Sequence, residues 1–188
     1  MTPRGYEKRK SELLERARVA RAARAEVKSA VAQVVNRKNE HDPRTKRWLE
    51  AIQRFRLAID LAYPDALREV DEGKRDISAV HSSDIVEYLA ADPIYFRSGY
   101  IKERLLRAIK KRDLEPAHAE LLQDAVLHVV STRDCREFRL YCQAATKVDD
   151  ARLRNGLAAI ATSGDADARR RVSWVLNALD QAVPTKRR

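Results

Sequence analysis

The 188-residue sequence is short of glycine, of cysteine and of uninterrupted apolar residues, with five Gly and two Cys. Five glycines are too few for elaborate phosphate-cradling loops, and no P-loop, dinucleotide-binding glycine motif, nucleophile elbow or zinc-ligand spacing occurs. No stretch approaches the roughly 18 uncharged apolar residues of a membrane span, and the amino-terminal residues lack the apolar run of a secretory signal. We therefore expect a cytoplasmic protein with no cofactor, no metal, no membrane partner and no small-molecule substrate.

The two cysteines, Cys135 and Cys142, are seven residues apart on one predicted helix. That spacing corresponds to about 10 Å along the helix axis, which exceeds the reach of a disulfide. A zinc site would need further ligands at short spacing, and only His128 is near in the sequence. We expect both thiols to pack as small apolar side chains.

The residues that are abundant predict an all-α protein. The chain is 44% hydrophobic and 35% charged, and its dominant residues, Ala, Leu, Arg and Glu, are good helix formers. Apolar residues recur three and four positions apart in segments that end at Asp, Pro or Gly, and strand patterns are almost absent. This length suits one domain, or a small domain with an appendage.

A basic helical hairpin is predicted for residues 1–63. Its first helix is expected at about 11–37, with the second half better anchored than the first, through the apolar residues Val27, Val31 and Val34. Asp42 and Pro43 fit an N-cap and the first residue of the second helix, which Pro64 ends. Because the connection is short, the two helices should be antiparallel.

The rest of the chain is predicted to form a connector (64–82), a stack of six short helices (83–181) and a basic tail (182–188). The candidate helix starts are Ser83, Asp92, Pro116, Asp134, Asp149 and Asp165. The later starts fall 15 to 16 residues apart, which suits stacked helical hairpins. Trp174, on the last of these helices, is expected in the core.

An Asp at a predicted helix start, with an Arg five or six residues later, occurs in Asp92/Arg97, Asp134/Arg139 and Asp165/Arg171. Together with the segment Arg171-Val-Ser-Trp-Val-Leu, this pattern resembles HEAT-type helical repeats over about residues 83–181. The resemblance implies antiparallel helices stacked into a binding or adaptor surface. Because HEAT-like DNA glycosylases exist, an enzyme stays open as an alternative, but fold does not imply function and we can name no catalytic residue.

Eight of the ten excess positive charges fall in residues 1–47, which hold 14 Lys and Arg against 6 Asp and Glu. Helical projection places Arg18, Arg21, Arg24 and Lys28 within about 120° of one another, as a ridge on one flank of the first helix. A second group surrounds the turn that follows: Arg37, Lys38, Arg44, Lys46 and Arg47. Guanidinium groups pair with phosphate oxygens, so we expect these residues to contact the nucleic-acid backbone without sequence specificity.

Other interpretations of the basic segment stay open. The flank can be merely solvated and offset by nearby glutamates, or it can dock on an acidic protein or self-associate within a scaffold. An anionic membrane is disfavoured because the apolar stripe lacks bulky anchoring side chains. Tyr95 and Arg97, in the densest aromatic cluster, are candidates for contact with a partner, although core packing is the simpler explanation of that cluster.

Three short clusters contain residue types found in catalytic or metal sites. They are His81-Ser82-Ser83-Asp84, Asp149-Asp150 and the pair Asp165 and Asp167. Each precedes or begins a predicted helix, where acids and hydroxyls satisfy the free amide groups and favour the helix dipole. We therefore interpret them as capping residues and not as catalytic or metal sites.

Overall fold

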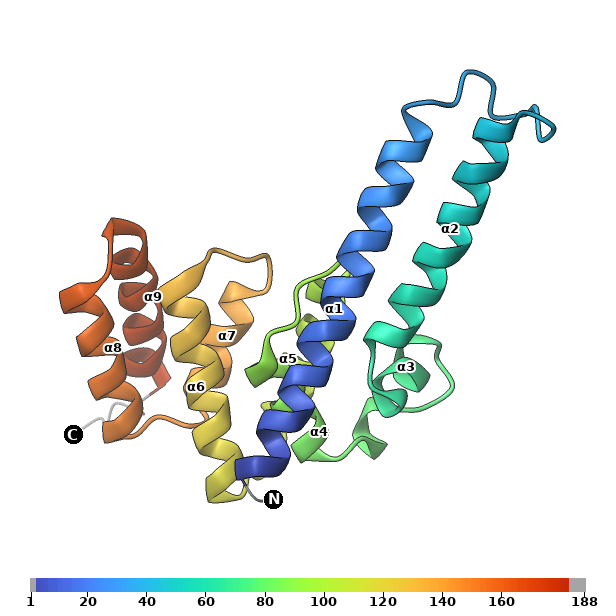
Figure 1. The fold of residues 1–188 in the computed structure, drawn as a ribbon. Coiled ribbons are helices and arrows are strands. Elements are labelled where there is room, and N and C mark those ends of the chain that lie inside the picture. The colour runs from blue at the N-terminus through green and yellow to red at the C-terminus, as the bar shows by residue number, and fades with distance from the viewer. Residues whose placement is uncertain (1–2, 183–188) are drawn as a thin grey trace, which may run out of the picture. The chain divides into compact units, whose positions relative to one another are not determined.

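The structure is a computed structural model that describes residues 3–182, and within this range every regular element is a helix (Figure 1). The prediction of an all-α fold is confirmed. The elements are α1 (Pro3–Val31), α2 (Pro43–Ala62), α3 (Asp65–Asp71), the 3₁₀ turn η1 (Ile77–Ala79), α4 (Ser82–Ala91), α5 (Ser98–Ile109), α6 (Pro116–Thr132), α7 (Phe138–Ala145), α8 (Ala151–Ser163) and α9 (Ala166–Ala182). The expected basic tail beyond residue 182 lies outside the described residues.

The chain forms two compact units. The first, here called the hairpin unit, contains the residues up to 76 together with 93–98, and the second, the stack unit, contains 77–92 and the residues from 99 onward. The first boundary falls inside the expected connector 64–82, which also holds α3 and η1. Residues 93–98, expected in the helical stack, belong instead to the hairpin unit.

In the hairpin unit, α1 and α2 run antiparallel, joined at one end by the loop at residues 32–42 (Figure 1). The helix α1 is shifted from the predicted range 11–37, because Pro3 is tolerated in a first turn and the chain tightens after Val31. There the Val34 amide donates to the Val31 carbonyl at 3.2 Å, and the Asn36 side chain accepts from the Lys38 amide at 3.0 Å, forming a turn.

The two long helices pack through small side chains. The buried residues along α1 and α2 include Leu13, Ala17, Ala20, Ala23, Ala51, Ala58 and Ala62. The second half of the first helix was expected to be the better anchored, but Val27 and Val31 are only half-buried. That expectation was wrong, because alanines at three-residue and four-residue spacing let the helices approach closely and bury the first half instead.

Both ends of α2 follow the prediction. The Asp42 carboxylate accepts a hydrogen bond from the Arg44 amide at 2.8 Å, and Pro43 occupies the first turn. The helix ends at Ala62, since Tyr63 precedes Pro64 and takes an extended conformation with φ −85° and ψ 142°. Asp42 and Pro43 are therefore a true helix start.

The stack unit contains six α-helices within the described residues, α4 to α9, as predicted. Asp165 is a helix cap as expected, since its carboxylate accepts from the Ala168 amide at 2.7 Å. Asp92 is not: it ends α4 in the left-handed conformation, with φ 46°, and the next helix begins only at Ser98. Asp134 is not a helix start either, because α7 begins at Phe138 with Glu137 as its N-cap. Asp150, not Asp149, caps α8 by accepting from the Leu153 amide at 2.9 Å. The HEAT-like detail of the stack stays a prediction.

Two further expectations about the stack unit have clear outcomes. Trp174, expected in the core, is 45% exposed. Cys135 is half-buried and Cys142 is buried, and both are free thiols, as predicted. They do not share a helix as expected, because α7 begins only at Phe138 and Cys135 precedes it. Gly99 marks a close approach between helices, because a Cβ atom at this position would lie 3.1 Å from the Glu137 carboxylate.

Candidate functional site: the basic helical hairpin

The four cations of the predicted ridge all lie on exposed positions of α1, but they are not equally available. Arg18 forms a bidentate ion pair with Glu15, with Nε and Nη2 each 2.7 Å from a carboxylate oxygen. This hydrogen-bonded pair raises the pKa of Arg18 and lowers the pKa of Glu15. The guanidinium of Arg18 is therefore already partnered within its own helix.

Arg21 and Arg24 hold residues 93–98 against the hairpin. The Arg21 Nη1 atom donates to the Ile94 carbonyl at 2.6 Å, and the Arg24 guanidinium lies 4.6 Å from the centre of the Phe96 ring. The same ring packs 5.8 Å from the ring of Phe55 on α2. Two of the four ridge cations thus have an internal structural role, which their sequence spacing did not reveal.

Lys28 is the exception in the ridge. It is exposed, and within residues 3–182 its side chain has no ion pair or hydrogen bond. It lies near the loop end of α1, so it joins the group of cations that surrounds the turn. We define residues 28–47 as the hairpin tip, which contains six Lys and Arg against two Asp and Glu.

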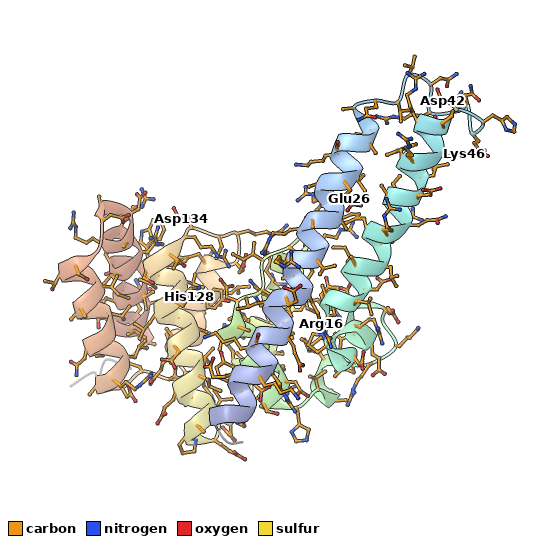
Figure 2. All side chains as sticks on the ribbon, viewed as in Figure 1. Arg16, Glu26, Asp42, Lys46, His128 and Asp134 are labelled. Atoms are coloured by element: carbon orange, nitrogen blue, oxygen red, sulfur yellow. The ribbon has the colours of Figure 1, made fainter. Side chains whose placement is uncertain are left out.

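The tip cations fall into two classes. Arg44 pairs with Asp42 at 3.0 Å, and the Arg37 guanidinium lies 5.5 Å from the ring centre of Trp48. The side chains of the remaining four are exposed and have no polar or ring partner among residues 3–182; they are Lys28, Lys38, Lys46 and Arg47. Figure 2 shows Asp42 and Lys46 at the loop end of the hairpin, away from Arg16.

The tip contributes almost nothing to the core. Between residues 24 and 54 only Thr45 and Ala51 are buried. The Thr45 hydroxyl donates to the Asn36 carbonyl at 3.2 Å, which ties the loop to the start of α2. An extension that buries so little gains little stability from burial, and its exposed surface carries a net positive charge.

Tyr95 and Arg97, the candidate partner-binding residues, differ in exposure. Tyr95 is 6% exposed, and its ring meets the ring of Tyr63 edge-on at 5.5 Å between centres. Arg97 is exposed and has φ 72°, a conformation rare for residues other than glycine. Tyr95 therefore has a packing role in the hairpin unit, and only Arg97 of this pair is accessible to a partner.

The stack unit contains a buried ionic cluster that was not predicted from the sequence. The carboxylate of Asp92 accepts from Lys102 Nζ at 2.5 Å and from Arg133 Nη2 at 2.7 Å, and both Asp92 and Lys102 are almost fully buried. Burial lowers the pKa of Lys102, although the neighbouring Asp92 charge opposes that shift. Glu137 lies 3.8 Å from Arg133, which balances the cluster at two charges of each sign. Asp92-Pro93 looks like an N-cap in sequence, so its burial could not be recognised there.

Nothing in the described part of the chain forms a metal centre, because residues 3–182 contain no group of three or more His, Cys, Asp or Glu side chains placed to hold an ion. The carboxylates of Asp149 and Asp150 have separate tasks, since Asp149 pairs with Arg154 at 2.8 Å while Asp150 caps α8. No helix in this range is long and apolar enough to cross a membrane.

Comparison with known proteins adds no further constraint. No family model matches this chain, and no curated protein or solved structure is significantly similar to it. Its function has to be inferred from its own residues.

Proposed function

We propose that this protein binds the nucleic-acid backbone, without sequence specificity, through the hairpin tip. The observation that carries the proposal is the set of four exposed cations that have no partner among residues 3–182: Lys28, Lys38, Lys46 and Arg47. They lie at the end of the hairpin that has the fewest buried side chains. This narrows the interface from the whole basic segment to residues 28–47.

The chemistry of these residues favours phosphate contacts over base contacts. Three of the four are lysines, whose ammonium groups act as compact charges and carry little information about base identity. Arg37, stacked on Trp48, adds a fifth cation whose planar group can still donate to phosphate oxygens. If four to five phosphates are neutralised on duplex DNA, the logarithm of the affinity should fall against the logarithm of the salt concentration with a slope of about −4.

A charge-reversal variant tests the proposal. The tip variant carries Lys28→Glu, Lys38→Glu, Lys46→Glu and Arg47→Glu. Its matched control reverses four exposed cations outside the tip that also have no internal partner within residues 3–182: Lys8→Glu, Arg16→Glu, Arg56→Glu and Lys111→Glu. Both variants have the same net charge, so any difference between them reports the place of the charge and not its amount.

Affinity for a random-sequence duplex is measured by fluorescence anisotropy over a range of salt concentrations. We expect the control to keep a slope of about −4 and the tip variant to lose most of it, because each removed phosphate contact reduces the slope by about one. Equal loss in the two variants would mean that net charge alone drives binding, and would refute an interface at the tip.

A second candidate function is a protein scaffold that self-associates through another face of the hairpin. A groove of about 310 Å³ lies there between α1 and α2, with the exposed apolar residues Val19 and Leu61 in its lining. Its edges carry both signs of charge, with Glu15 and Arg16 on α1 and the ion pair of Asp65 and Arg68 beyond α2. Such mixed edges suit a second copy of the same surface.

Sedimentation equilibrium tests this alternative. A dimer that dissociates in the variant Val19→Lys/Leu61→Lys supports self-association, because two charges would replace the apolar floor. A wild-type protein that stays monomeric at high micromolar concentration excludes it.

A further inference from the structure

A second cavity lies in the stack unit, between α7 and α9. It has a volume of about 470 Å³, which is in the range of pockets that hold small organic groups. Its lining combines aromatic, carboxamide and cationic side chains, among them Phe138, Trp174, Asn177 and Arg139. Neither the hairpin tip nor the buried ionic cluster includes any of these residues.

Trp174 is the most unusual member of this lining, since a large aromatic side chain is left 45% exposed. Its orientation is nevertheless fixed. The ring of Phe138 meets it at 5.7 Å with an interplanar angle of 64°, and the Arg170 guanidinium lies 5.3 Å from its centre. A tryptophan held on two sides by α7 and its own helix, yet open to the groove, is a preorganised stacking surface.

Three carboxamides line the groove together with this ring: Gln143, Asn177 and Gln181. The Gln143 Oε1 atom accepts a hydrogen bond from Lys110 Nζ at 2.8 Å, which leaves the NH₂ group of Gln143 able to donate. A carboxamide presents a donor and an acceptor in one plane. This pattern matches the edge of a nucleobase, which carries donors and acceptors in the same plane.

Two cationic side chains lie beside the same groove. Arg139 is exposed, lines the cavity and has no hydrogen bond or ion pair among residues 3–182. Lys110, held by Gln143, contributes a second positive charge next to the carboxamides. An aromatic surface, carboxamides and flanking cations are the three components that single-strand binding sites use for the base, its edge and its phosphate.

We infer that this groove binds one unpaired base of a single-stranded nucleic acid. The base stacks on Trp174, its edge contacts the carboxamides of Gln143 and Asn177, and its phosphate pairs with Arg139. The inference rests on the proposed function for the class of ligand and adds a base-contacting site on the stack unit. An acidic peptide is the competing ligand, because its carboxylates can also pair with Arg139, and the test therefore includes one as a separate probe.

The chain offers a direct spectroscopic test, because it contains only two tryptophans, Trp48 and Trp174. In a Trp48→Phe variant, all tryptophan fluorescence comes from the groove. Titration with a single-stranded decanucleotide should quench this emission, whereas a duplex of the same sequence should not, since its bases are already stacked. An acidic decapeptide serves as the competing probe.

Substitution of the stacking residue provides the affinity test. Trp174→Leu should weaken binding of the single strand by about 5- to 150-fold, the range seen when one base loses its aromatic partner, and leave duplex binding unchanged. Trp174→Phe should recover part of the loss, because it keeps a ring. Circular dichroism and urea unfolding show whether each variant is folded, and the Phe variant keeps the test valid if the Leu variant is not.

The outcomes separate the two proposals. Absence of quenching by the single strand, or quenching by the acidic peptide alone, overturns the base site and leaves the hairpin tip untouched. Quenching that persists when the four tip substitutions are added to Trp48→Phe, with the duplex affinity of the tip variant equal to that of the matched control, overturns the tip and supports the base site. Loss of duplex binding in the tip variant together with single-strand quenching in Trp48→Phe supports both.

Discussion

The guanidinium of Arg24 lies 4.6 Å from the ring centre of Phe96 and joins α1 to a segment far along the chain. Residues 93–98 follow the stack-unit helix α4, yet they belong to the hairpin unit. Arg21 strengthens the attachment through the Ile94 carbonyl. A charged flank that looks available for a partner is therefore engaged, in part, in the protein's own tertiary structure.

A double-mutant cycle measures this contact. Arg24→Met and Phe96→Leu each remove one partner, and urea unfolding gives the free energy of each variant and of the double variant. We expect a coupling energy of about 0.5–1 kcal/mol, since the Phe96 ring is 39% exposed and exposed cation–π pairs fall at the low end of their range. A coupling indistinguishable from zero would show that the two side chains merely lie near one another.

Substitutions in the buried ionic cluster are expected to reduce the free energy of unfolding by unequal amounts. Asp92→Asn leaves Lys102 and Arg133 without their shared carboxylate, and loss of a buried counter-charge costs about 3–5 kcal/mol. Lys102→Met is expected to cost clearly less, because Asp92 keeps the bidentate contact with Arg133, whose Nη2 and Nε atoms donate to its two oxygens at 2.7 and 3.3 Å. Urea unfolding at neutral pH gives both values, and a Lys102 variant at least as unstable as the Asp92 variant contradicts this account.

Element type was the part of the fold that the sequence could predict. Three-residue and four-residue spacing identified the helices, and the short-range signals at Asp42, Pro43 and Asp165 marked true helix starts. Asp92 carried the same signal and had a different role, because its carboxylate is neutralised by cations from α5 and from the end of α6. Local sequence cannot separate an exposed cap from a buried ion pair when the partners lie ten and forty-one residues away.

The candidate site, like the fold, could be predicted from the sequence only in part. Helical projection placed Arg18, Arg21, Arg24 and Lys28 on exposed positions of one helix, but it could not say which of them had partners. The partner of Arg18, Glu15, lies only three residues away, whereas the partners of Arg21 and Arg24 come from residues 93–98. The groove at Trp174 was not predicted, because a tryptophan at helical spacing is normally part of a core.

The thiol of Cys135 predicts a loss of stability at high pH. Burial, with the Glu137 charge adding to it, raises the pKa of Cys135 to about 12, from 9.0. The unfolded chain then loses this proton at lower pH than the folded chain does, so stability is full below pH 9 and falls as pH rises toward 12. The fall measured by urea unfolding should be smaller in Cys135→Ala than in wild type. An identical pH profile in the two proteins contradicts a raised pKa for this half-buried thiol.

Thr45 connects the order of the hairpin tip to its proposed role. Its side chain is fully buried, and the hydroxyl donates to the Asn36 carbonyl at 3.2 Å. Thr45→Val keeps the shape but removes one of the two hydrogen bonds that this carbonyl accepts, since the Asn39 amide still donates to it at 3.1 Å. Loss of the Thr45 hydrogen bond costs about 1 kcal/mol. Because so little else in the tip is buried, we expect the effect to stay local, with faster amide hydrogen exchange in residues 33–47 and unchanged exchange in α6 and α9. Thr45→Ser, which keeps the hydroxyl, is the matched control.

Duplex affinity should fall in Thr45→Val while its salt slope stays near −4, since the cations remain and only their positions become less ordered. Faster exchange in residues 33–47 with unchanged duplex affinity would show that the tip cations do not need a defined arrangement. Unchanged exchange in these residues would show that Thr45 does not order the loop.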